Sequence, residues 1–112
     1  MKYPKLLDIV SCTPQNCGMV VATCVITLHL DGVFSLKDKR SIVKSIVTRL
    51  PQQFNVAVAE VDHQDVWQTA VIGIVTVGND RRYLQGLLEK TVTWIETQRP
   101  DAPIATYSIE II

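Results

Sequence analysis

The sequence of 112 residues lacks the short motifs that identify common enzyme classes. It contains no phosphate-binding P-loop, no G-x-G-x-x-G dinucleotide motif and no G-x-S-x-G nucleophile motif. Its two histidines and scattered carboxylates do not have the spacing of metal ligands. We therefore expect a non-catalytic protein that holds neither a cofactor nor a metal ion.

A net charge is missing as well, because 11 Lys and Arg residues balance 11 Asp and Glu residues. No overall field attracts nucleic acid or an anionic membrane, so any contact with a polyanion must come from local charge segregation. The three cysteines, Cys12, Cys17 and Cys24, are an odd number without a C-x-x-C pair. This usage is typical of a reduced, cytoplasmic chain with ordinary thiols.

No apolar run is long enough to cross a membrane. The longest, residues 19–30, is interrupted by two threonines and a histidine. Asp8 breaks the apolar residues that a secretory signal needs. Residues 1–18 contain two prolines and no sustained periodicity, so we interpret them as an N-terminal extension before a single domain at 19–112. The hydrophobic content of 47% is enough for a core in that domain.

Residues 35–50 have the clearest pattern in the chain. Ser35 followed by Asp38 is close to a capping box, in which the side-chain oxygen of Ser35 accepts hydrogen bonds from free N–H groups at a helix start. Apolar residues recur at helical spacing until Pro51, which predicts a helix over 36–50. The apolar face of this helix consists of Leu36, Ile42, Val43, Ile46, Val47 and Leu50.

The same helix carries five basic residues and one acid. Lys37, Arg40 and Lys44 form a stripe on one flank of the apolar face, whereas Lys39 falls inside the apolar sector. A lysine at such a position must extend its ammonium to solvent or find a partner. Glu60 is that partner if the second strand ends beneath the helix start.

Four strands and a second helix complete the prediction. Alternating, β-branched segments predict strands at residues 19–30, 54–61, 67–77 and 104–112. A second helix is predicted over 80–98, with Asn79 as its N-cap. The order predicts a ferredoxin-like βαββαβ sandwich: an antiparallel sheet in the order 4-1-3-2, with both helices on one face. The residues expected to point from the helices toward the sheet are Ile42, Ile46, Leu50, Leu84, Leu88 and Ile95.

This topology brings the start of the first helix, the hairpin at 60–66 and the segment 99–104 to one end of the domain. The hairpin carries three acids and no base, so it faces the basic helix start. We take this end as the candidate binding site and assign no catalytic residue. Its candidate residues are Ser35, Lys37, Lys39, Arg40, Glu60, Asp65 and Trp67, with His29, Asp62 and His63 nearby.

Two interpretations of this end stay open. A helix N-terminus with Ser35 and three cations fits a phosphate or carboxylate. Alternatively the cations pair with the hairpin acids, and each exposed pair contributes about 0–1 kcal/mol. Trp67 fits either a packing position at a strand edge or a partly exposed contact residue. It is the only aromatic residue of its strand, whereas RNA-recognition modules place stacking aromatics across their middle strands.

Several motifs in register resemble the bacterial YlxP-like family, a domain of unknown function. They are residues 35–40 (SLKDKR), 54–61 (FNVAVAEV), 65–68 (DVWQ) and 79–82 (NDRR), and the resemblance covers about residues 19–112. It implies a ferredoxin-like fold and a small cytosolic protein whose gene often lies beside genes of translation initiation and ribosome maturation. It implies no reaction, ligand or catalytic residue. The sequence departs from the family pattern in its 1–18 extension and at Asp38, where the family usually has Glu.

Two functions from different classes remain. The first is a binding protein of translation or ribosome maturation that contacts RNA backbone or a protein through the basic helix start. The second is a homo-oligomeric regulatory or scaffold domain that binds a small anionic ligand. It is favoured by the sheet face away from the helices, where a monomer would expose a large apolar surface. A second subunit, as in a homodimer, or the 1–18 extension would cover this surface, which is formed by Val21, Val25, Val71, Val75 and Val77.

Overall fold

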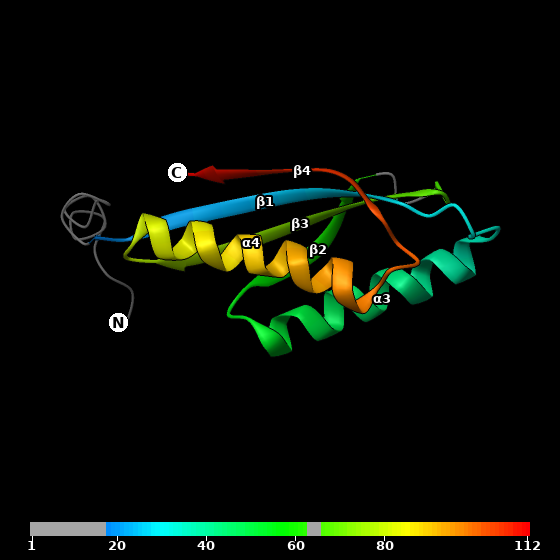
Figure 1. Cartoon of the computed structure of the whole chain (residues 1–112), viewed down its shortest axis with the longest axis horizontal. Helices are drawn as coiled ribbons and strands as arrows, with labels where there is room; N and C mark the ends of the chain where they lie inside the picture. The colour runs from blue at the N-terminus through cyan, green and yellow to red at the C-terminus, as the bar shows by residue number, and fades with distance from the viewer. Residues whose placement is uncertain (1–17, 63–65) are drawn as a thin grey trace, which may run out of the picture.

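The computed structural model describes residues 18–62 and 66–112. Its elements, in chain order, are β1 (Val20–His29), α3 (Leu36–Gln53), β2 (Ala57–Asp62), β3 (Thr69–Gly78), α4 (Arg81–Gln98) and β4 (Ile104–Ile111). The sheet order is β2-β3-β1-β4 and all neighbouring strands are antiparallel. Figure 1 shows α3 and α4 on the same side of this sheet, running in opposite directions. The predicted ferredoxin-like topology is therefore confirmed.

The core lies between the sheet and the two helices. Alternate residues of β1 point to it, because successive side chains of a strand face opposite sides, and Ala22, Cys24, Ile26 and Leu28 are completely buried. All six residues expected to point from the helices toward the sheet are buried: Ile42, Ile46, Leu50, Leu84, Leu88 and Ile95. The helical and alternating patterns thus predict which residues form the core.

Helix α3 continues past Pro51, which is a correction to the expected end at residue 50. Proline removes one backbone donor, but the next turn still closes, because the Phe54 N–H donates to the Leu50 carbonyl at 3.0 Å. Phe54 is thereby the C-cap of the helix, and the Val56 N–H then bonds to the Phe54 carbonyl at 2.9 Å. This turn occupies residues 54–56, so β2 begins at Ala57 rather than at the expected residue 54. The bounds of the other three strands differ from expectation by two residues or fewer.

Helix α4 begins one residue later than expected, and its N-cap is Asp80 instead of Asn79. The Asp80 Oδ1 atom accepts hydrogen bonds from the Arg82 N–H at 3.0 Å and the Tyr83 N–H at 3.3 Å. Both residue types are good N-caps, so their order in the sequence does not decide between them. The carboxylate also has the charge that a helix N-terminus favours.

Substitution of Asp80 and of Asn79 tests which of the two residues caps α4. Asp80→Ala is expected to lower the free energy of unfolding by about 1 kcal/mol, because two N–H groups of the first turn lose their acceptor. Asn79→Ala is the matched control and should change stability by less than about 0.5 kcal/mol, as at an ordinary surface position. Urea denaturation of both variants measures the difference. Equal losses in the two variants would contradict the assignment of the cap.

The sheet face opposite the helices, here called the open sheet face, is covered by no described element. Val25, Val75 and Val77 are 43%, 40% and 51% exposed there, as the alternation predicts. Val71 is a correction, since it is only 9% exposed. Val71 lies between Thr27 and Asp62, which reduce its exposure. Val75 lies beside the smaller Ala57 and stays exposed.

Candidate binding site at the start of helix α3

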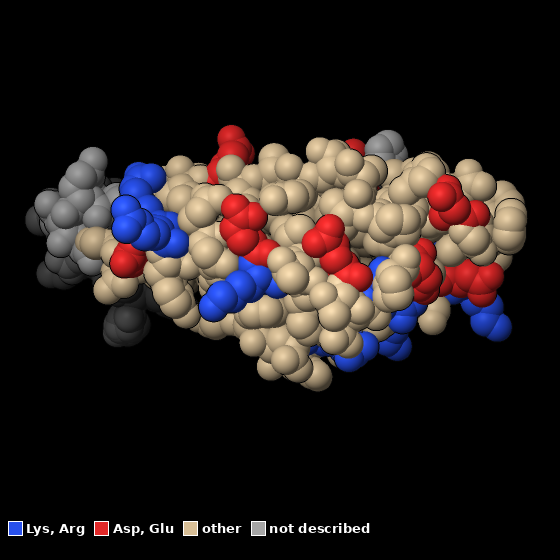
Figure 2. All heavy atoms as spheres, in the orientation of Figure 1, with Lys and Arg blue, Asp and Glu red and all other residues tan. Residues whose placement is uncertain are grey.

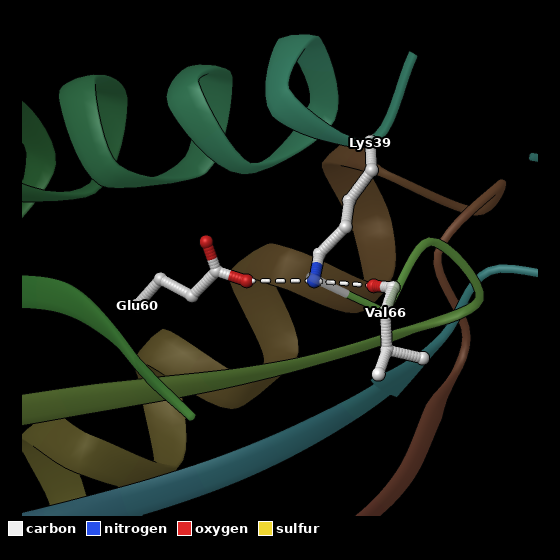
Figure 3. A network of polar contacts seen from close by, with 3 residues as sticks. All are labelled: Lys39, Glu60 and Val66. Carbon is white, nitrogen blue, oxygen red and sulfur yellow. Dashed lines mark hydrogen bonds and ion pairs between the residues drawn. The ribbon is translucent and has the colours of Figure 1, made fainter. Parts of the chain in front are cut away.

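Lys39 connects three segments of the chain at the start of α3. Its Nζ atom lies 2.9 Å from Glu60 Oε2 and donates a 2.5 Å hydrogen bond to the Val66 carbonyl. Figure 3 shows the side chain descending from α3, with the ammonium between these two oxygens. The predicted pair of Lys39 and Glu60 is therefore confirmed. The ammonium links α3 to the end of β2 and to the segment that leads into β3.

The Lys39 side chain and its partners are largely buried, which determines whether a ligand can reach the ammonium. The Lys39 side chain is 1% exposed and that of Glu60 is 17% exposed. A buried ammonium needs a counter-charge and further hydrogen bonds, because it has lost its hydration, and Glu60 and Val66 supply them. A ligand in solution has no access to the Lys39 ammonium. We infer that Lys39 and Glu60 support the site, while contact with a partner belongs to their exposed neighbours.

Lys37, Arg40 and Lys44 are those neighbours, and together they are called the basic stripe. All three are exposed, and they lie three and four residues apart, which places them on one flank of α3. None of them forms an ion pair within residues 18–62 and 66–112. Figure 2 shows basic side chains along the edge of the molecule formed by α3. The stripe therefore presents unpaired positive charge to the solvent.

The helix start itself has a different electrostatic character. Ser35 is the N-cap, and its Oγ atom accepts a hydrogen bond from the Asp38 N–H at 3.1 Å, as predicted. The adjacent hollow of about 300 Å³ is lined by Asp38 and Asp101 among others. The Asp101 carboxylate is paired with the Arg99 guanidinium at 2.8 Å, so Asp38 is the carboxylate of this hollow that opposes an anion, although the helix dipole favours one. An anion is held better along the basic stripe than at the end of the helix.

The remaining candidate residues lie around this end. Trp67 is exposed and close to the end of β1, because the Leu30 N–H donates to the Gln68 carbonyl at 2.8 Å. His29 Nε2 lies 2.8 Å from Asp31 Oδ1, and this pair is exposed. Asp62 is exposed at the end of β2, while His63 and Asp65 lie outside the described residues.

Two groups at this end of the domain are not indicated by the sequence patterns. The Val66 carbonyl is a backbone atom, so no side-chain pattern could indicate it. Asp101 belongs to the connection between α4 and β4, which was expected at this end but was not considered as part of the site. The available signal is its place in a short connection at this end, where it follows Arg99, with which it forms an ion pair of 2.8 Å.

The described residues contain further ionisable groups away from the start of α3. Within residues 18–62 and 66–112, no three His, Cys, Asp or Glu side chains are placed to hold a metal ion. Burial, followed by the charge of Glu89, raises the pKa of the Cys24 thiol to about 11. A hydrogen bond of 3.0 Å from Tyr107 Oη to Glu89 Oε1 raises the Tyr107 pKa. Cys24 is buried between the sheet and the helices, whereas Tyr107 is exposed on β4 beside α4. Among the helices that the structure describes, none is long and apolar enough to span a membrane.

The chain is similar to proteins whose activity is unknown. Residues 21–109 match the family described as Protein of unknown function (DUF503). Uncharacterized protein YlxP from Bacillus subtilis (strain 168) is 36% identical over 63 residues, which cover 56% of this chain and 68% of that protein.

A solved structure shares the fold. The crystal structure of a dimeric protein of unknown function and ferredoxin-like fold from Bacteroides fragilis NCTC 9343 has a TM-score of 0.56. It is 12% identical, and the alignment covers 85% of this chain and 95% of that one. The family match spans most of the chain and the identity to YlxP spans two thirds of that relative, so this protein is a YlxP-like member of the DUF503 family of unknown function.

Proposed function

We propose that this protein is a non-catalytic binding protein that contacts RNA backbone through the basic stripe. The observation that carries the proposal is the contrast between the cations of α3. The buried Lys39 is paired with a carboxylate, whereas the exposed Lys37, Arg40 and Lys44 form no ion pair with any described residue. Three unpaired cations along about 10 Å of one helix fit consecutive phosphates, and such contacts do not depend on base sequence.

Translation is the proposed setting. The resemblance to YlxP-like proteins points to genes of translation initiation and ribosome maturation, and a cytoplasmic protein there meets ribosomal RNA at high concentration. Lys37, Arg40 and Lys44 are the proposed phosphate contacts, and the candidate residues Ser35 and Trp67 lie at the same end of the domain. Lys39 and Glu60 stabilise the end of the domain beneath them, whereas the candidate residue Asp65 lies outside the described residues. A small anionic ligand at the helix start is less favoured, because Asp38 lines that hollow and its described lining includes no lysine or arginine.

Binding of a fluorescent oligouridine at several salt concentrations tests the proposal. Three phosphate contacts predict a slope of about −2 for log K against log salt, so the affinity should fall about 20-fold between about 50 and 200 mM salt. The variant Lys37→Gln, Arg40→Gln, Lys44→Gln should lose this dependence along with most of the affinity. Arg81→Gln, Arg82→Gln removes two exposed cations at the start of α4 and should bind like the wild type.

Two results would overturn the proposal: no measurable binding by the wild type, or equal weakening by the stripe variant and the α4 control. Sedimentation of the same proteins with purified ribosomal subunits gives a second measurement. We expect the wild type and the α4 control to migrate with a subunit at low salt and the stripe variant to remain at the top of the gradient.

We also propose that the protein forms a homodimer, as a regulatory or scaffold domain would. The exposed valines of the open sheet face support this, because they add up to a larger apolar surface than a monomer usually presents. The Bacteroides fragilis protein with a similar fold is described as dimeric. A dimer would carry two basic stripes and so contact RNA at two points, which raises the overall affinity.

A further inference from the structure

The open sheet face carries a shallow apolar groove of about 440 Å³. Its walls include Val25, Val61 and Val75, and almost none of its lining is polar. A second hollow of about 430 Å³ shares Ala57 and Val75 with it and continues it along β2 and β3. The groove therefore runs over three strands.

Small residues at matching register positions create this groove. Gly73 of β3 lies between Val25 of β1 and Ala59 of β2. Val61 covers Gly73 closely, since a Cβ atom at position 73 would lie 2.8 Å from Val61 Cγ1. Val61 occupies the space above Gly73, so the open floor is formed by the alanines of β2, and the valines stand beside it. A surface that alternates small and large side chains in this way can receive the valines of an identical surface.

Charge is distributed as in an interface with an apolar centre and a polar border. The middle of the open sheet face, over β1 and β3, carries valine, threonine and glycine. Charged groups occur at its margin, with Glu110 on the edge strand β4 and Asp62 at the end of β2. Glu60 points to the opposite side, toward Lys39. Two such faces can meet without burying a described charge at their centre, which would be costly.

The open sheet face is large enough for a specific contact between two copies of the chain. The strands β2, β3, β1 and β4 contain 6, 10, 10 and 8 residues. At about 3.3 Å per residue and about 4.8 Å between strands, the face measures about 500 Å². Two copies would bury about 1,000 Å², the lower limit for a specific interface. This area is smaller than that of most permanent assemblies, so we expect a dimer that forms reversibly as the concentration rises.

We infer that a second copy of this chain covers the open sheet face, sheet against sheet, with the valines of each copy seated in the groove of the other. The inference rests on the homodimer proposed above and assigns its surface. The two sheets would stack about 10 Å apart, with the helices on the outer sides. Both basic stripes then remain exposed, on opposite sides of the dimer.

Analytical ultracentrifugation of the full chain across the micromolar range tests this inference. The wild type should reach twice the 12.5 kDa of one chain as its concentration rises. Val75→Lys should remain a monomer at every concentration, because it places an ammonium in the middle of the apolar face. Its far-UV circular dichroism should match the wild type, since Val75 is already 40% exposed in one subunit. If Val75→Lys fails to fold, Val25→Lys on the neighbouring strand replaces it and should likewise remain a monomer.

Tyr83→Lys is the control, because it replaces a 66% exposed apolar residue on α4 and should dimerise normally. A wild type that dimerises together with Val75→Lys and Val25→Lys overturns the choice of surface and leaves the homodimer standing. A wild type that is monomeric throughout overturns both the homodimer and this inference.

Discussion

Replacing Glu60 by alanine is expected to lower the free energy of unfolding by about 3 kcal/mol. The Lys39 ammonium is 1% exposed and lies 2.9 Å from the Glu60 carboxylate. The variant leaves that ammonium buried without the counter-charge, and such a loss is far more costly than the loss of a surface ion pair. Urea denaturation should show a lower midpoint with an unchanged m-value.

Replacing Lys39, the other member of the pair, should change the free energy of unfolding much less. Lys39→Met is expected to stay within about 1 kcal/mol of the wild type or to be more stable, because methionine fills a similar volume in an apolar stripe. Glu60 is then left without Lys39, but its partial exposure gives it access to water. In the Lys39→Met background, Glu60→Ala should cost less than about 1 kcal/mol, which makes the coupling energy of the pair about 2 kcal/mol or more. Equal costs of Glu60→Ala in both backgrounds would show that the pair contributes nothing to stability.

Cys24 is expected to react about a hundred times more slowly with a thiol reagent at pH 8 than an unstructured cysteine. Burial and the charge of Glu89 raise its pKa from the ordinary value of 9.0 to about 11, and only the thiolate reacts. The variant Cys12→Ser, Cys17→Ser leaves Cys24 as the only thiol of the chain, so the labelling rate can be read directly. A native rate close to that of the urea-unfolded chain would contradict the burial of this thiol.

The raised pKa of Cys24 also predicts a loss of folding stability at alkaline pH. The folded-state pKa of Cys24 lies above its ordinary value of 9.0, so its stabilisation is complete below about pH 9 and is lost as the pH rises toward 11. Two pKa units correspond to at most about 3 kcal/mol. Cys24→Ala should remove most of this dependence. Tyr107, whose pKa is also raised, changes stability in the same direction, and Tyr107→Phe separates its share.

Much of the fold follows from local patterns. The alternation in β1 and the helical spacing in α3 and α4 predict the core and the strand order, because a βαββαβ chain with one apolar face per helix has few compact solutions. The errors lie at element ends, where single hydrogen bonds decide. The Leu50 carbonyl accepts from Phe54 and extends α3 beyond Pro51, and Asp80 rather than Asn79 caps α4.

The candidate site is predictable in part. Lys39 is conspicuous because it interrupts an apolar stripe, and topology then points to Glu60. The Val66 carbonyl and Asp101 come from other connections, so only the folded chain brings them to the start of α3. The groove on the open sheet face depends on Gly73 lying beside Ala59 and Val25, and that cross-strand register is not encoded in any one segment.

The Lys39 network also constrains how the sheet is assembled. β2 is an edge strand of six residues rich in alanine and valine, so its side chains discriminate poorly between alternative pairings with β3. A slip by one residue turns Glu60 onto the outer face and places an apolar side chain beneath Lys39. The ammonium would then be buried without the carboxylate, and that cost excludes the slipped arrangement. A single buried charge on α3 thereby selects the native register of a strand that lies elsewhere in the sequence.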